Sequence, residues 1–179
     1  MSQIIQVEAV ILAGGRSRRM GQDKAALRLG RRTLLGHARA LADELGLPVR
    51  VITEDLTPGQ GPLGGIETAL ISANAQRILF LGCDMPFLAK ALVERILAVE
   101  APAVFASKQG CVGFPFCLSR TILPRVQSRL AAGVRSLQAF SRTIRARRVR
   151  VRSADWGQLT NLNTPTDLAA ARKRLQSPR

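Results

Sequence analysis

Apolar positions along the chain fall into two alternating patterns. Short runs of β-branched and other apolar residues predict strands, and segments with apolar residues three and four positions apart predict helices. The predicted strands span 4–12, 48–53, 77–84, 102–107 and 147–152. The predicted helices span 33–45, 66–75, 88–99, 119–132, 136–142 and 166–175, and a Gly/Pro-rich turn region spans 59–65. This alternation predicts an α/β fold of three layers, α/β/α, with a Rossmann-like sheet that is mixed but mainly parallel.

Two predicted strands carry patterns that indicate their place in the sheet. Residues 77–84 (R-I-L-F-L-G-C-D) are apolar almost without interruption, which is typical of a central strand buried on both faces. Residues 147–152 alternate Arg with Val, which is typical of an edge strand with one solvated face.

Length and composition indicate one globular domain over residues 1–179, with no linker and no internal repeat. An apolar fraction of 46% excludes a disordered chain. The longest apolar runs are strand-sized, well short of the roughly 18 residues of a membrane span. The N-terminal segment has no basic region and carries Glu8, so it does not resemble a signal peptide. Three cysteines without a C-x-x-C pair suit a reducing cytoplasm and indicate no cysteine metal site.

The formal net charge of +15 has two interpretations, an anionic partner or a compositional bias towards arginine. Arginine supplies 23 of the 27 basic residues, and these are spread along the chain with one dense run at 142–152. That distribution favours a solvated arginine-rich surface over a nucleic-acid-binding site.

The segment Val10–Lys24 (V-I-L-A-G-G-R-S-R-R-M-G-Q-D-K) joins a strand to a loop of glycines and cations. Ligands of open α/β sheets bind beyond the carboxyl ends of the strands, where this loop begins. Gly14 and Gly15 permit a sharp turn, and backbone N–H groups there can hold phosphate oxygens. The cationic side chains that follow can add charge-assisted bonds; they are Arg16, Arg18, Arg19 and Lys24.

This loop predicts a polyphosphate-binding site that matches neither of two common phosphate-binding loops. It is not a Walker A loop, because Gly21 is followed by Gln22 rather than by Lys and Ser or Thr. It is not a G-x-G-x-x-G loop either. The alternative, an ordinary glycine turn with solvated arginines, would suffice for an isolated G-G pair but not for the whole string.

Asp84 follows a predicted central strand and is the candidate ligand of Mg²⁺. The metal usually takes one or two carboxylates and shares phosphate oxygens, so one Asp near a phosphate loop is sufficient. The alternative is that Asp84 caps a helix or forms a turn before Pro86. Cys83 is interpreted as a small packing residue rather than a nucleophile.

The opening motif resembles a known family. L-A-G-G-R-S-R-R-M-G-Q-D-K is similar to the L-A-G-G-x-S-x-R-M-G-x-D-K signature of molybdenum cofactor guanylyltransferases, within the wider cofactor and sugar nucleotidyltransferases. Three further motifs follow in the same order as in that family: G-P-L-G-G-I at 61–66, G-C-D-M-P-F at 82–87 and N-L-N-T-P-T-D-L at 161–168. The resemblance therefore covers almost the whole chain.

The resemblance implies a nucleotidyltransferase fold and a Mg²⁺-dependent transfer of GMP from GTP to the phosphate of molybdopterin. The products would be pyrophosphate and the guanine dinucleotide form of the molybdenum cofactor. The implied partners are these two substrates, with transient contact to molybdoenzymes or their chaperones. A membrane or a nucleic acid is not among them.

The resemblance also assigns the site residues. Its nucleotide-binding residues are Leu12, Ala13, Gly14, Gly15, Lys24, Asp55, Gly64 and Asp84. Arg19, Lys24 and Asp84 are the catalytic residues, with Mg²⁺ on Asp84. Asn161 and Asn163 alternate in a stretch that reads as extended, so both can face one side and hydrogen-bond a pterin or a phosphate. The alternative without a binding role is that Asp55 is a solvated acid in a loop and that the two asparagines form a turn before Thr164 and Pro165.

The chain departs from the family between Lys24 and Asp55. It is shorter there, without a strand and short helix that often carry an Asn near the base.

The cytidylyl branch of the family typically reads L-A-A-G and D-Q-P, whereas this chain reads L-A-G-G and D-M-P, which favours guanine. Two rival functions are a related nucleotidyltransferase with another acceptor, cytidylyl or sugar-phosphate, and a non-catalytic basic module that binds nucleic acid or a partner protein.

Overall fold

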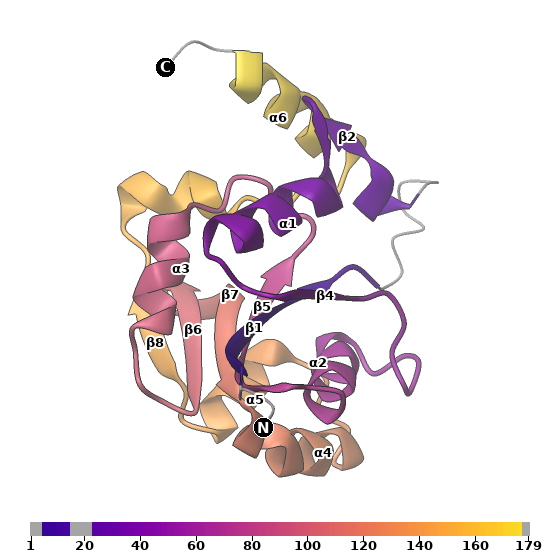
Figure 1. Cartoon of the computed structure of the whole chain (residues 1–179), viewed down its shortest axis with the longest axis vertical. Coiled ribbons are helices and arrows are strands. Elements are labelled where there is room, and N and C mark those ends of the chain that lie inside the picture. Colours follow the sequence, from indigo (N-terminus) through magenta and orange to yellow (C-terminus); the bar gives the residue numbers. More distant parts are fainter. Residues whose placement is uncertain (1–4, 15–22, 177–179) are drawn as a thin grey trace.

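The computed structural model of the chain describes residues 5–14 and 23–176. Its main sheet has six strands in the order β4-β1-β5-β7-β6-β8 (Figure 1). These strands are β1 (Ile5–Leu12), β4 (Val49–Ile52), β5 (Ala75–Gly82), β6 (Ala103–Lys108), β7 (Cys111–Ser119) and β8 (Arg147–Arg150). β7 runs antiparallel to both of its neighbours, whereas the other adjacent pairs are parallel. The prediction of a mixed, mainly parallel sheet is therefore confirmed.

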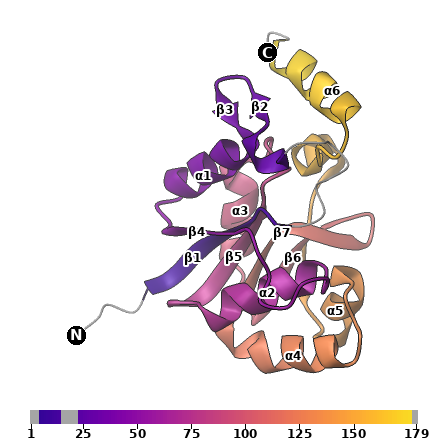
Figure 2. The ribbon, with the colours of Figure 1, turned by 90° about the vertical axis from the view of Figure 1, so that its right-hand side faces the viewer.

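Helices cover both faces of this sheet (Figure 2). One face carries α1 (Leu34–Glu44) and α3 (Lys90–Leu97), and the other carries α2 (Pro62–Ile71), α4 (Leu123–Ala131) and α5 (Leu137–Thr143). The 3₁₀ helices within the described residues are η2 (Lys24–Ala26), η3 (Arg120–Ile122) and η4 (Ser153–Leu159). The three layers of the predicted α/β/α fold are thus present. No helix in the described part of the chain is long and apolar enough to cross a membrane.

The alternation of side chains along the strands builds a separate core on each face. Val10 and Phe80 face α2, α4 and α5, whereas Ile11 and Leu81 face α1 and α3. On the first face Phe116 of β7 stacks between two other rings, with centroids 4.8 Å from Phe80 and 4.7 Å from Phe105. β5 lies between β1 and β7, which confirms the central position predicted for 77–84.

A small hairpin and the last helix form a projection above the sheet, at the top of Figures 1 and 2. The hairpin consists of β2 (Arg28–Leu29) and β3 (Arg32–Thr33), and the helix is α6 (Pro165–Gln176). They share an apolar cluster of Leu29, Leu34, Leu162, Leu168 and Ala171. This cluster brings η2, which precedes the hairpin, beside the 161–164 segment, which precedes α6.

Several element boundaries differ from the predictions. α2 begins at Pro62 rather than Ile66, because proline is accepted in the first turn of a helix, where its missing N–H is not needed. Gly64 therefore lies in a helix and not in a turn. β5 ends at Gly82, two residues before Asp84. β7 was not predicted as a strand, because Gly113 and Pro115 interrupt its apolar pattern.

β8 is the edge strand that the Arg/Val alternation predicts. Arg147, Arg148 and Arg150 are exposed, whereas Val149 is buried against the sheet. The densest basic run of the chain therefore lies along a solvated edge, which suits the role of charge in preventing edge-to-edge pairing.

A buried ion pair joins β1, β4 and α2. The guanidinium of Arg50 donates to both carboxylate oxygens of Glu8, at 2.7 and 3.2 Å, and Glu8 is only 2% exposed. The same guanidinium donates to the hydroxyl of Ser72 and to the carbonyl of Ala69 in α2. These bonds satisfy the buried charge and fix the relative positions of the three elements.

We expect Arg50→Met to lower the free energy of unfolding by about 3 kcal/mol, because the substitution leaves the Glu8 carboxylate buried without its counter-charge. Urea unfolding of the variant measures the loss. Arg39→Met, which removes an exposed arginine from α1, is the matched control. An equal loss in the two variants would contradict a structural role for the ion pair.

Candidate active site

Three connecting segments meet at the carboxyl ends of β1, β4 and β5. Because these strands are parallel, the residues after Leu12, Ile52 and Gly82 emerge at one edge of the sheet. In open α/β folds this edge is where ligands bind. The 161–164 segment joins them there, since the N–H of Leu162 donates to the carbonyl of Asp84 at 2.9 Å.

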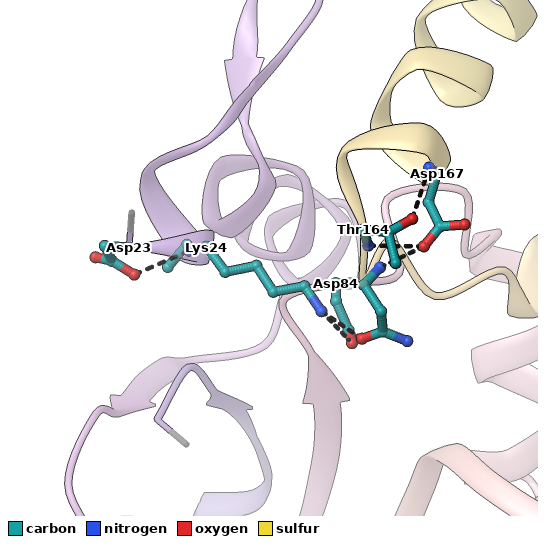
Figure 3. Close-up of polar contacts among 7 residues, drawn as sticks. Asp23, Lys24, Asp84, Thr164 and Asp167 are labelled. Atoms are coloured by element: carbon teal, nitrogen blue, oxygen red, sulfur yellow. Dashed lines mark hydrogen bonds and ion pairs between the residues drawn. The ribbon is translucent and has the colours of Figure 1, made fainter. Parts of the chain in front are cut away.

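Lys24 lies at the centre of this edge (Figure 3). Its Nζ donates to Asp84 Oδ2 at 2.9 Å and to Asn163 Oδ1 at 2.7 Å, and the residue is only 8% exposed. Asp23 fixes the start of η2, because its carboxylate accepts a hydrogen bond from the N–H of Ala25. A buried ammonium group needs a counter-charge and acceptors, and Asp84 and Asn163 supply them.

The carboxylate of Asp84 reaches from Lys24 to the end of β5. Oδ2 accepts from Lys24, while Oδ1 lies over Gly82, 2.8 Å from where a Cβ of that residue would be. Gly82 therefore leaves the space that the carboxylate occupies. Of the two alternative roles, a helix cap is wrong, because α3 begins at Lys90 with Ala89 as its cap, whereas Asp84 does lie in a turn before Pro86.

Asp55 and Leu12 lie against the first turn of α2. A Cβ on Gly64 would be 2.9 Å from Asp55 Oδ2, and one on Gly65 would be 3.2 Å from Oδ1 and 3.3 Å from Leu12 Cδ2. The two glycines thus permit the close approach of helix and carboxylate. Burial raises the pKa of Asp55 above its ordinary value. Asp55 is partly buried beside α2, in contrast to a freely solvated loop acid.

The start of the glycine loop is pinned to β4. The N–H groups of Ala13 and Gly14 both donate to the carbonyl of Ile52, at 2.9 and 3.1 Å. A Cβ on Gly14 would lie 2.4 Å from the carbonyl oxygen of Thr53, so this position accepts only glycine without movement of the backbone. The N–H of Gly14 is therefore already bonded to Ile52 in this structure, and phosphate binding by the backbone of the glycine loop stays a prediction. The N–H groups of Ala13 and Gly14 hold the two strands together.

The remaining cations predicted for the loop, including Arg19, lie outside the described residues, as does Gly15.

Cys83 precedes Asp84 and is buried. Burial, with a further contribution from Asp84, raises the pKa of its thiol to about 11. The thiol is therefore neutral at physiological pH, as expected of a packing residue and not of a nucleophile.

Comparison with known proteins shows to which family the chain is similar. The model of the MobA-like NTP transferase domain matches residues 9–55 and 39–149, which together span most of the chain. The molybdenum cofactor guanylyltransferase of Xanthomonas euvesicatoria is 35% identical, over 87% of this chain and 89% of the relative.

The chain belongs to the MobA-like NTP transferase family.

Two solved structures share the fold of this MobA-like chain. Molybdopterin-guanine dinucleotide biosynthesis protein A from Archaeoglobus fulgidus superposes with a TM-score of 0.70 at 18% identity, over 94% of this chain and 98% of that one. The 2-C-methyl-D-erythritol 4-phosphate cytidylyltransferase from Thermus thermophilus superposes with a TM-score of 0.72 at 17% identity, over 97% of this chain and all of that one. Because these two proteins have different names but the same fold, the fold alone does not determine which base or which acceptor a member uses.

The asparagine segment of this MobA-like chain is not a strand. Residues 160–163 pair with no strand of the sheet. The alternation of faces nevertheless holds, since Leu162 is buried between exposed Asn161 and Asn163. Asn163 contacts Lys24 directly.

Asp167 holds this segment in place at the start of α6 (Figure 3). Its Oδ2 accepts from the N–H groups of Asn163 and Thr164, at 2.9 and 2.8 Å, and its own N–H donates to the Thr164 hydroxyl. This is a reciprocal helix cap. The sequence analysis did not identify Asp167, although the spacing of Thr164 and Asp167 is the signal for such a cap.

A metal ion at this edge would depend on few protein ligands. Within the described residues no group of three or more His, Cys, Asp or Glu side chains lies close enough together to hold a metal. Asp84 and Asn163 instead offer a carboxylate and an amide oxygen at one point. Mg²⁺ prefers oxygen ligands and often binds through one carboxylate and substrate phosphates. The donors present therefore fit Mg²⁺ shared with a polyphosphate.

The segment between β4 and α2 is irregular. Residues 53–61, all of them described, contain neither a strand nor a helix and lead directly into α2. On this flank Asp55 and Gln60 both lie against the first turn of α2, each 2.9 Å from where a Cβ of Gly64 would be.

We expect Asp167→Asn to destabilise the chain near neutral pH and to have less effect in acid. Hydrogen bonds from the N–H of Asn163, and then from Thr164, lower the pKa of Asp167 from its ordinary value of 3.8. A carboxylate with a lowered folded-state pKa stabilises the fold above the unfolded-state value, and this contribution is lost as the pH falls through the folded value. Urea midpoints of both chains across this pH window provide the measurement. A difference in midpoint that stays constant across the window would contradict the cap.

Proposed function

We propose that this chain transfers GMP from GTP to the phosphate of molybdopterin, forming the guanine dinucleotide cofactor and pyrophosphate. The observation that carries the proposal is the contact of Lys24 with Asp84 and Asn163 at the carboxyl edge of the sheet. Family membership and the name of the 35% identical relative support the same reaction.

The reaction joins an oxygen of the acceptor phosphate to the α-phosphorus of GTP and breaks the bond to pyrophosphate. Such a transfer needs alignment and neutralisation of charge more than covalent catalysis. The Lys24 ammonium would contact the triphosphate and stabilise the negative charge that develops on it. Because Asp84 and Asn163 already hold its Nζ, little reorganisation is needed when the substrate binds.

Asp84 would hold Mg²⁺, which neutralises phosphate charge when bound. In this proposal the carboxylate has two tasks, since it also orients Lys24 through Oδ2. The other oxygen, Oδ1, lies over Gly82 at the end of β5. Arg19, which lies outside the described residues, stays a prediction as a further triphosphate contact.

The nucleotide would lie on the β4–β1 side of Asp84. Leu12 and Asp55 are there, against Gly64 and Gly65 of α2, and Gly14 lies against Thr53 at the end of β4. The pterin would lie on the other side, within reach of the exposed faces of Asn161 and Asn163. Because Asn163 also accepts a hydrogen bond from Lys24, it would connect the two half-sites.

The test of this function is an assay with GTP labelled in the α-phosphate, Mg²⁺ and molybdopterin. We expect label to appear in the dinucleotide product, with GTP preferred over CTP and ATP. Equal or better transfer from CTP would assign the chain to a cytidylyl reaction. Absence of transfer from every nucleotide, together with a salt-sensitive shift of random DNA, would indicate a basic binding module.

Asp84→Asn should preserve the fold and lower Mg²⁺-dependent turnover roughly 10- to 100-fold. Asn keeps the size and one oxygen but removes the charge that holds a hard cation, and charged contacts of this kind are worth about 1.5–3 kcal/mol. A titration of turnover with Mg²⁺ measures the effect. Asp43→Asn, an exposed carboxylate in α1, is the control. An unchanged titration curve in Asp84→Asn would place the metal elsewhere.

A further inference from the structure

Phe114 of β7 lies beside the carboxylate of Asp84. β7 pairs with β5 through Phe80 and Phe116, so Phe114 comes level with Gly82, at the open end of the sheet. The ring atom Cγ lies 3.7 Å from where a Cβ of Gly82 would be, and Asp84 Oδ1 lies 2.8 Å from the same point. The aromatic ring and the carboxylate thus meet in the space above a glycine, where Met85 Cγ also lies 3.8 Å from the same point.

The strand order assigns that space to the acceptor. Across the sheet the order is β4, β1, β5, β7. The nucleotide-side residues Asp55, Leu12 and Gly14 follow or end β4 and β1, and Asp84 follows β5. A second substrate that meets the nucleotide at Asp84 must approach from the side of the next strand, which is β7.

The ring of Phe114 is partly exposed but held in position. Its centroid lies 4.9 Å from that of Phe116, with the two planes tilted by 47°. Phe116 is fully buried and is itself stacked between Phe80 and Phe105. The ring therefore rests on a rigid aromatic column, and a fixed, accessible π face binds flat heterocycles well.

We propose that Phe114 binds the heterocycle of the acceptor by stacking and so positions its phosphate at Lys24 and Asp84. The inference rests on the proposed function for the identity of the acceptor as a pterin. It adds a binding residue on β7, a strand that holds none of the predicted site residues.

The test compares Phe114→Leu with Phe114→Tyr in the transfer assay. Leu keeps the apolar volume but removes the π face, whereas Tyr keeps the ring. We expect Phe114→Leu to raise the KM for molybdopterin about five- to tenfold without a change in the KM for GTP, and Phe114→Tyr to restore the wild-type value. Phe105→Leu is the matched control, because its ring also stacks on Phe116 but is fully buried.

Equal increases in both KM values, or the same increase in Phe105→Leu, would overturn the inference and leave Phe114 a core residue. Quenching of the fluorescence of free pterin by each chain separates this result from a failure of the proposed function. Quenching by wild type and Phe114→Tyr but not by Phe114→Leu supports the inference even if no GMP is transferred. Transfer without such quenching overturns it while the proposed function stands, and the absence of both transfer and quenching overturns both.

Discussion

An ammonium group removed from water must have a negative partner, and in this chain Lys24 meets that requirement through Asp84. The 2.9 Å ion pair and the 2.7 Å bond to Asn163 join positions that are 60 and 139 residues apart. Each partner is fixed by a further hydrogen bond. The carbonyl of Asp84 accepts from the N–H of Leu162, and the N–H of Asn163 donates to the carboxylate of Asp167. The arrangement of the active edge follows from this one contact.

Two packed units meet at that contact. On one side the Glu8–Arg50 pair fixes β1, β4 and α2, beside which lie the residues proposed to bind the nucleotide. On the other side the apolar cluster around Leu29 and Leu168 fixes the β2–β3 hairpin and α6, which hold Lys24 and Asn163. The large positive charge of the chain has little part in this geometry, because the arginines of β8 lie along a solvated edge. The site itself depends on one lysine among the described residues and on the carboxylates around it.

Local pattern was sufficient to predict the fold class, the central strand and the edge strand, because hydrophobic periodicity and burial are directly linked. It was insufficient where backbone chemistry opposed the apolar pattern, as in β7, where Gly113 and Pro115 interrupt a buried run. The motifs singled out Lys24, Asp84 and Asn163, but their mutual contact depends on tertiary packing that no local pattern contains. For the same reason the sequence does not reveal that the N–H of Gly14 is bonded to the carbonyl of Ile52.

The most direct test of this account is a double-mutant cycle on Lys24→Met and Asp84→Asn, measured as kcat/KM for GTP in the transfer assay. If the ion pair organises the site, each single variant already loses most of what the pair supplies. The double variant should then be little worse than the more damaged single variant, with a coupling energy above about 1 kcal/mol. Losses that add in the double variant would show that the two residues act independently and would contradict the account.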